Sequence, residues 1–214
     1  MSRSVVRSLV CFGAFLVSAA GAADLPPQEA GSYTAVYKMT SRQRDDDPGA
    51  EWKYTADDTV TIAVLDKQAR WDRKTAGSSD IVDSVAGTIT YFGGKIPAGT
   101  ARRARTTSPG IGWEFGYARV AKAAEKAPEV LGEATIAGQP CTRLKFVSEM
   151  YGDPEFCVAK NGVVLKFANA SSNAEATYEA VSVDDKAPDA SKFVTPAGLK
   201  VEERGERTRD VKIR

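Results

Sequence analysis

The sequence predicts a mainly β protein of the α+β class, with its strands in one antiparallel sheet or open barrel. About nine or ten short segments alternate apolar and polar side chains, which is the period of a strand. Tight-turn residues separate these segments, which favours antiparallel neighbours. Only residues 113–127 have the composition of a good helix.

Residues 1–22 have the features of a secretory signal peptide. Two arginines give a basic start, an apolar run of about a dozen residues follows, and Ala20-Gly21-Ala22 offers the small residues that a signal peptidase reads. The alternative is a transmembrane anchor, but the run is short for a bilayer. Cys11 lies within the run and not at its end, where a lipoprotein signal needs its cysteine. We therefore expect cleavage near Ala22 and a free periplasmic chain.

After cleavage two cysteines remain, Cys141 and Cys157. Exported proteins with two cysteines usually pair them, so a disulfide is predicted, with two unpaired thiols as the alternative. Their even separation gives them the same phase if both lie on strands. Two cysteines without any histidine are a poor ligand set for zinc, so no metal site is expected.

Composition argues against nucleic-acid binding and against most catalytic machinery. Removing residues 1–22 leaves 27 cationic against 28 anionic residues, whereas nucleic-acid-binding domains are clearly basic. Histidine is absent, and no G-x-S-x-G motif occurs. A hydrolase using Asp72, Asp80 or Asp83 remains as an alternative that needs two carboxylates in one cleft. The prediction is therefore a protein that is not an enzyme and has no cofactor.

The first half of the mature chain reads as paired strands. The acidic run 44–51 is expected to be a solvated turn, since its spacing does not match an EF-hand loop. Residues 97–112 look looser, and Arg102, Arg103 and Arg105 form a basic cluster there. That cluster is interpreted as a solvated edge, with a contact to lipid phosphates as the alternative. The expected strands lie in 32–42, 57–75 around a turn at 66–68, and 79–95 around a turn at 86–87.

The predicted helix 113–127 ends at Pro128 and begins with Trp113, Phe115 and Tyr117. It is interpreted first as a helix packed on a sheet, and alternatively as a lid over an apolar cavity.

The second half alternates more cleanly. Both cysteines share a phase with polar residues, so they are expected on the polar face, and the opposite, apolar face is left for a core or cavity. Asn161-Gly162 is a strong two-residue hairpin signal. The expected strands lie in 129–139, 141–147, 155–160, 163–170 and 173–183.

Two stretches resemble the LolA/LolB-like lipoprotein-carrier superfamily. AVSVDDKAPDASKFVTPAGLKVEE, residues 180–203, is similar to the close of those proteins, where a Pro-containing link leads to Phe and then to a TPAG segment. VLGEATIAGQPCTRLKF, residues 130–146, followed by FCVAKNGVVLKF, is similar to their glycine-turned hairpins. The likeness covers about the last 75 residues and contains no catalytic motif.

The resemblance implies a strongly curved, incomplete barrel with one or more helices closing its concave face. It implies one domain over residues 23–203, with a charged tail at 204–214, and a monomer that holds a lipid or an acylated protein and touches membrane surfaces transiently. A non-lipid envelope-interaction protein with a filled core is the alternative, because most inward apolar residues simply pack. The cavity-lining residues expected from the apolar phases are Tyr37, Met39, Ile62, Val64, Leu144, Phe146, Phe156, Val158, Leu165, Phe167 and Tyr178, with Trp113 and Phe115 in the lid.

Overall fold

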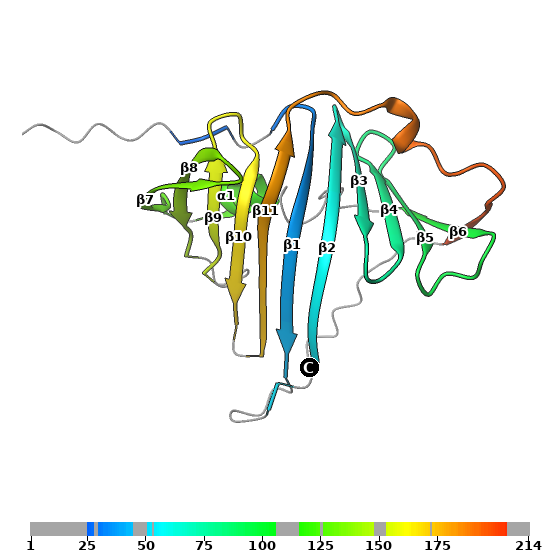
Figure 1. Cartoon of the computed structure of the whole chain (residues 1–214), viewed down its shortest axis with the longest axis horizontal. Coiled ribbons are helices and arrows are strands. Elements are labelled where there is room, and N and C mark those ends of the chain that lie inside the picture. Colours follow the sequence, from blue (N-terminus) through cyan, green and yellow to red (C-terminus); the bar gives the residue numbers. More distant parts are fainter. Residues whose placement is uncertain are drawn as a thin grey trace, which may run out of the picture.

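The chain is described by a computed structural model over residues 25–27, 30–44, 51–52, 54–105, 116–124, 126–147, 153–171 and 173–204. These residues form one twelve-stranded sheet, one α-helix and one 3-10 helix (Figure 1). In chain order the elements are β1 (Tyr33–Gln43), β2 (Tyr54–Leu65), β3 (Gln68–Arg73), β4 (Ser78–Asp83), β5 (Thr88–Gly93), β6 (Thr100–Arg105), α1 (Gly116–Ala123), β7 (Glu129–Ile136), β8 (Gln139–Lys145), β9 (Glu155–Ala159), β10 (Val164–Ala170), β11 (Ala174–Asp184), η1 (Ala190–Phe193) and β12 (Lys200–Arg204).

The sheet consists of two meanders joined by the pairing of β1 with β11. Its order is β12-β6-β5-β4-β3-β2-β1-β11-β10-β9-β8-β7. Every neighbouring pair is antiparallel except β12 and β6, which run parallel. β12 and β7 lie at opposite ends of this order, so the curved sheet is open (Figure 1). The predicted curved, mainly β architecture is confirmed.

Register shifts accompany the curvature. One lies between Val36 and Tyr37 against β11, and another between Val164 and Lys166 against β9. A bulge inserts an extra residue into one strand and increases the local twist. The Tyr37 hydroxyl, which is buried, donates to the Val164 carbonyl at 2.8 Å and so links the two irregular points across β11.

The expectation that helices close the concave face is not met by the described residues. α1 has eight residues, and its Tyr117 and Val120 pack with residues of β8, β9 and β10 in the smaller core cluster. Burial raises the pKa of the Tyr117 phenol, and its hydroxyl donates to the Pro26 carbonyl at 3.2 Å. The helix ends at Ala123, before the predicted end at residue 127, and Trp113 and Phe115 lie outside the described residues.

Two strands contradict the sequence interpretation of the basic cluster. The region 97–112 contains a full strand, β6, which carries Arg102 and Arg103. β12 pairs along this strand, so β6 is not the solvated edge that was expected. The Glu202 and Glu203 side chains of β12 lie 3.9 and 3.3 Å from the guanidinium groups of Arg102 and Arg103.

The disulfide is present and buried. Cys141 and Cys157 join the adjacent strands β8 and β9, with their Cα atoms 5.4 Å apart. Cys157 pairs with Arg143 and Lys166, so it lies in the polar phase as predicted. Both cysteines are nevertheless only 2% exposed and belong to the larger core cluster, so the side of these strands that was expected to be polar is part of the core at this point. Small side chains next to long ones are covered by their neighbours.

The core has two clusters, and β9 contributes to both. Cys157 and Ala159 join a large cluster centred on β1, β2 and β3, whereas Phe156 and Val158 join a smaller cluster under α1. All four residues are buried. β9 is therefore covered on both faces, which makes it the most enclosed strand of this half of the sheet.

Candidate functional site

The apolar residues predicted to line a cavity pack against one another in the structure. Phe156 lies between Tyr117 and Phe167, with ring centroids 5.4 and 5.3 Å away, and Phe167 in turn lies 6.3 Å from Tyr178. This continuous row of rings runs from α1 to β11. In the larger cluster or packed against it are Tyr37, Met39, Ile62, Val64, Leu165 and Tyr178, and in the smaller one or packed against it are Leu144, Phe146, Phe156, Val158 and Phe167.

All eleven residues belong to these two clusters or pack against them, and none of them lines the pocket described below. Their role in holding an acyl chain stays a prediction. The two further residues of that set, Trp113 and Phe115, lie outside the described residues.

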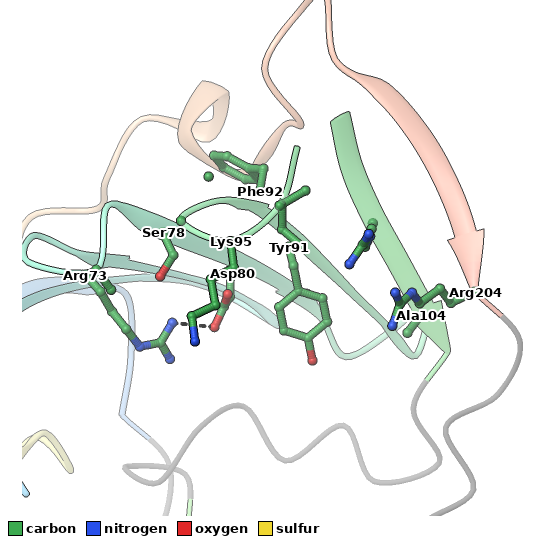
Figure 2. A pocket seen from close by; sticks show the side chains of 13 residues that line it. Arg73, Ser78, Asp80, Tyr91, Phe92, Lys95, Ala104 and Arg204 are labelled. Carbon is green, nitrogen blue, oxygen red and sulfur yellow. Dashed lines mark hydrogen bonds and ion pairs between the residues drawn. The ribbon is translucent and has the colours of Figure 1, made fainter. Parts of the chain in front are cut away.

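A pocket of about 510 Å³ lies elsewhere, on the wing of the sheet formed by β3 to β6 and β12 (Figure 2). This volume falls in the range of about 300–1,000 Å³ that is usual for small-molecule sites. Its apolar wall includes Tyr91 and Ile96, together with Ala76 and Ala104. Phe92 also borders the pocket, but its ring points to the opposite face of the sheet, where the Arg70 guanidinium lies 5.4 Å from the ring centroid. Its polar lining consists of Arg73, Ser78, Asp80, Lys95, Arg102 and Arg204.

Strand register explains why these side chains meet. Asp80 pairs with Tyr91, and Tyr91 pairs with Arg102, so all three point to the same face of the sheet. Figure 2 shows Asp80 and Tyr91 directed to one side of the strands. Lys95 comes from the loop after β5, where the Ile96 N–H donates to the Gly93 carbonyl at 3.0 Å. The pocket is thus a product of pairing between neighbouring hairpins.

The pocket has an excess of positive charge. Four cationic side chains line it, against one carboxylate. That carboxylate, Asp80, is paired with Arg73 at 2.7 Å (Figure 2). Arg102 is 29% exposed, and its Nε atom is buried without a hydrogen-bond partner among the described residues. The carboxylate of Glu202 lies 3.9 Å from this atom, which is beyond hydrogen-bond distance.

The structure does not bring the three candidate catalytic carboxylates together. Asp80 lines the pocket, whereas Asp72 pairs with Ser79 and so lies on the other face of the sheet. Asp83 accepts backbone N–H groups in the turn between β4 and β5. The cleft with two free carboxylates that glycoside hydrolysis requires is therefore not formed by these residues.

Among the described residues, no group of three His, Cys, Asp or Glu side chains is placed to hold a metal ion. In the same part of the chain, no helix has the length and apolar character needed to cross a membrane.

The sequence indicated two of the lining residues, Arg102 through the basic cluster and Asp80 as a candidate carboxylate. Alternation along β4 and β5 also assigns Asp80 and Tyr91 each to one face of its own strand. The sequence did not reveal the register between these strands or the position of β12.

No protein-family model and no curated protein matches the chain. Solved structures do share its fold. An uncharacterized conserved protein from Thermus thermophilus has a TM-score of 0.52 and 11% identity, over 83% of this chain and 93% of that one. MucB has a TM-score of 0.52 and 13% identity over 80% of this chain, which spans 59% of the MucB chain.

A LolA superfamily protein, NE2245 from Nitrosomonas europaea, is also among the similar structures, with a TM-score of 0.40 and 10% identity over 80% of this chain and 92% of that one. Solved structures similar to this chain therefore include one whose name places it in the superfamily that residues 130–146 and 180–203 resemble. At these identities the likenesses concern the fold alone, and function has to be argued from the site.

Proposed function

We propose that this protein is an exported, non-catalytic binding protein that holds a lipid or an acylated protein, with the apolar part of the ligand in the pocket on the β3–β6 wing. The observation that carries this proposal is the pocket of about 510 Å³, with its wall of Tyr91, Ile96 and Ala104. Each buried methylene of an acyl chain contributes roughly 0.8 kcal/mol, so such a wall binds a chain without hydrogen bonds.

Export to the periplasm is part of the same proposal. The signal-like residues 1–22 lie outside the described residues, so their cleavage stays a prediction. The buried disulfide supports an oxidising compartment, since such bonds seldom persist in the cytosol.

Native mass spectrometry tests the proposal directly. The protein is purified from the periplasm without detergent, and the same sample is extracted for lipids. A stoichiometric adduct with the mass of a fatty acid or phospholipid supports the lipid-binding role. A bare protein mass that remains bare after incubation with lipids contradicts it.

Two matched tryptophan variants locate the ligand. Ala76 is exposed, lines the pocket and precedes Gly77 in the turn between β3 and β4, so Ala76→Trp is expected to block the pocket and remove the adduct. Ala86 precedes Gly87 in the next hairpin turn, is equally exposed and is not a lining residue, so Ala86→Trp should retain it. Loss of the adduct in both variants, or in neither, would place the ligand elsewhere.

A second function is favoured by the filled core. The residues expected to line an acyl-chain cavity pack against one another in two clusters, as residues of an ordinary folding core do. A non-lipid protein that binds partners in the envelope needs no larger cavity. A bare mass in the first experiment, together with co-purification of a defined envelope protein, would favour this function.

A further inference from the structure

We infer that the cationic end of this pocket recognises an oxyanion, a carboxylate or phosphate, that is attached to an apolar chain. This inference rests on the proposed function and specifies the chemical class of its ligand. Arg102, Lys95 and Arg204 are the recognising side chains, and Tyr91, Ile96 and Ala104 contact the apolar part.

The first argument is charge. The opposite charges of Arg73 and Asp80, which form an ion pair at 2.7 Å, cancel each other within the pocket. Lys95, Arg102 and Arg204 then remain as three cationic lining residues. Glu202 compensates Arg102 only partly, because the Nε–Oε2 distance is 3.9 Å and the Glu202 side chain is 47% exposed. A site with net positive charge and apolar walls favours an anionic amphiphile over a neutral one.

The second argument is the unsatisfied Nε of Arg102. A buried donor without an acceptor is costly, and such groups are rare in native structures. The guanidinium presents its donors in a fixed fork that matches the two oxygens of a carboxylate or phosphate. An oxyanion bound at this end of the pocket would supply the missing acceptor.

The third argument is the contrast with the next residue. Arg103 lies on the same strand but points to the opposite face, since it pairs with Thr90 while Arg102 pairs with Tyr91. Its Nε donates to Thr90 Oγ1 at 3.2 Å, and its guanidinium lies 3.3 Å from Glu203. Arg103 is therefore satisfied within the protein, and it provides a matched control for Arg102.

Calorimetric titration of the purified protein tests the inference. The probes are dodecanoate, dodecyl phosphate, the uncharged glycerol monoester of dodecanoic acid, and inorganic phosphate, each below any micelle concentration. We expect both anionic amphiphiles to bind at least about tenfold more tightly than the uncharged ester, the scale of one hydrogen bond to a charged group. Their affinity should fall as salt is raised from low concentration.

Variants separate recognition from folding. Arg102→Gln should lower the affinity for both anionic amphiphiles about tenfold and leave the affinity for the uncharged ester unchanged. Arg103→Gln should change the affinity for none of these probes. Lys95 is exposed and lies in a loop, so Lys95→Met provides a second test that does not depend on the tolerance of β6 to substitution. Like Arg102→Gln, this change should lower the affinity for the anionic probes.

The outcomes distinguish this inference from the proposed function. Equal affinity for dodecanoate and the uncharged ester, with no effect of Arg102→Gln or Lys95→Met, overturns the inference and leaves the lipid-binding role intact. Binding of inorganic phosphate alone, lost in Arg102→Gln, supports the oxyanion site but overturns the lipid-binding role. No binding of any probe overturns both.

Discussion

Gly93, at the end of β5, lies where a single added carbon would disturb the pocket wall. Its φ is +74°, and a Cβ atom there would come closer than 3.0 Å to the Gly77 carbonyl oxygen in the turn between β3 and β4. The neighbouring Gly94 N–H donates to that same oxygen at 2.8 Å, so the two hairpins cannot separate freely. We expect Gly93→Ala to lower the free energy of unfolding by about 3 kcal/mol, which combines backbone strain and overpacking.

Gly99 provides the control, since its φ is also +74° but a Cβ atom there would meet nothing within 4 Å. Gly99→Ala should therefore cost only the strain of a positive φ, about 1 kcal/mol. Urea unfolding of both variants measures the difference. Equal losses would show that the close approach of the two hairpins contributes nothing to stability.

The second residue-scale prediction concerns acid stability at Asp83. The Ala86 N–H, and then the Gln68 side chain, donate hydrogen bonds that hold the pKa of Asp83 below its ordinary value, despite an opposing effect of partial burial. Because the folded state favours the carboxylate, its contribution is complete above the unfolded pKa, near 4, and is lost as the pH falls through the lower folded value.

Asp83→Asn should accordingly lower stability at neutral pH by about 1 kcal/mol or less, since the group is partly solvated. The difference from the unsubstituted protein should shrink steadily below about pH 4. Chemical unfolding at several pH values measures this. Stability profiles that stay parallel down to strongly acidic pH would contradict the role assigned to Asp83.

At the scale of elements, β9 is the strand on which the α1 half of the sheet depends. It is buried on both faces, and Cys157 ties it to Cys141 on β8. The disulfide closes a loop with a sequence separation of 16. A loop of that size contributes about 3 kcal/mol in the chain-entropy estimate. Cys141→Ser should therefore lower the melting temperature markedly under oxidising conditions.

The double variant Cys141→Ser with Cys157→Ser controls for the free thiol that the single change leaves behind. The unsubstituted protein, once reduced, should have nearly the same melting temperature as this double variant. An unchanged melting temperature of Cys141→Ser without reductant would contradict a stabilising role for the disulfide.

Sequence reasoning located elements well where strands alternate and pair locally. Tyr33, Ala35 and Tyr37 are buried and alternate with more exposed residues, as the predicted strand requires, and β1 spans nearly the residues predicted. A hairpin at Asn161-Gly162 is confirmed, but its loop is longer than the two residues predicted, since the Ala159 N–H donates to the Val163 carbonyl at 2.8 Å across residues 160–162. β6 was missed because its sequence TARRAR does not alternate, and β12 because KVEER is charged and pairs with a strand about 100 residues earlier. Neither strand carries a local signal.

At the scale of the whole molecule, the sequence did not reveal where space remains. Alternation assigns Tyr37, Ile62 or Phe156 to a face, but it does not tell whether neighbouring side chains fill the volume that they face. Here these residues pack in two clusters, and the pocket described above lies on the other wing. Its lining comes from strands β3 to β6 and β12, so only the complete pairing of the sheet defines it.

The C-terminal strand β12 has two consequences for the molecule as a whole. It covers the backbone edge of β6, beginning with the Lys200 N–H, which donates to the Gly99 carbonyl at 2.8 Å, and it brings Arg204 to the pocket. An uncovered strand edge is a template for pairing with another chain. A chain that ends at Gly198 should therefore self-associate, with a sedimentation coefficient that rises with protein concentration. It should also bind dodecanoate more weakly, because Arg204 is lost.

A chain that ends at Arg204 is the matched control, since it keeps β12 and lacks only residues 205–214. It should sediment as the full chain does and keep its affinity for dodecanoate. If the chain ending at Gly198 instead remained a monomer with unchanged affinity, β12 would neither protect the β6 edge nor complete the pocket. If it self-associated but bound dodecanoate normally, the edge function would stand and Arg204 would have no part in recognition. Sedimentation velocity and calorimetry on the same two samples therefore test the roles of β12 in edge protection and in ligand binding separately.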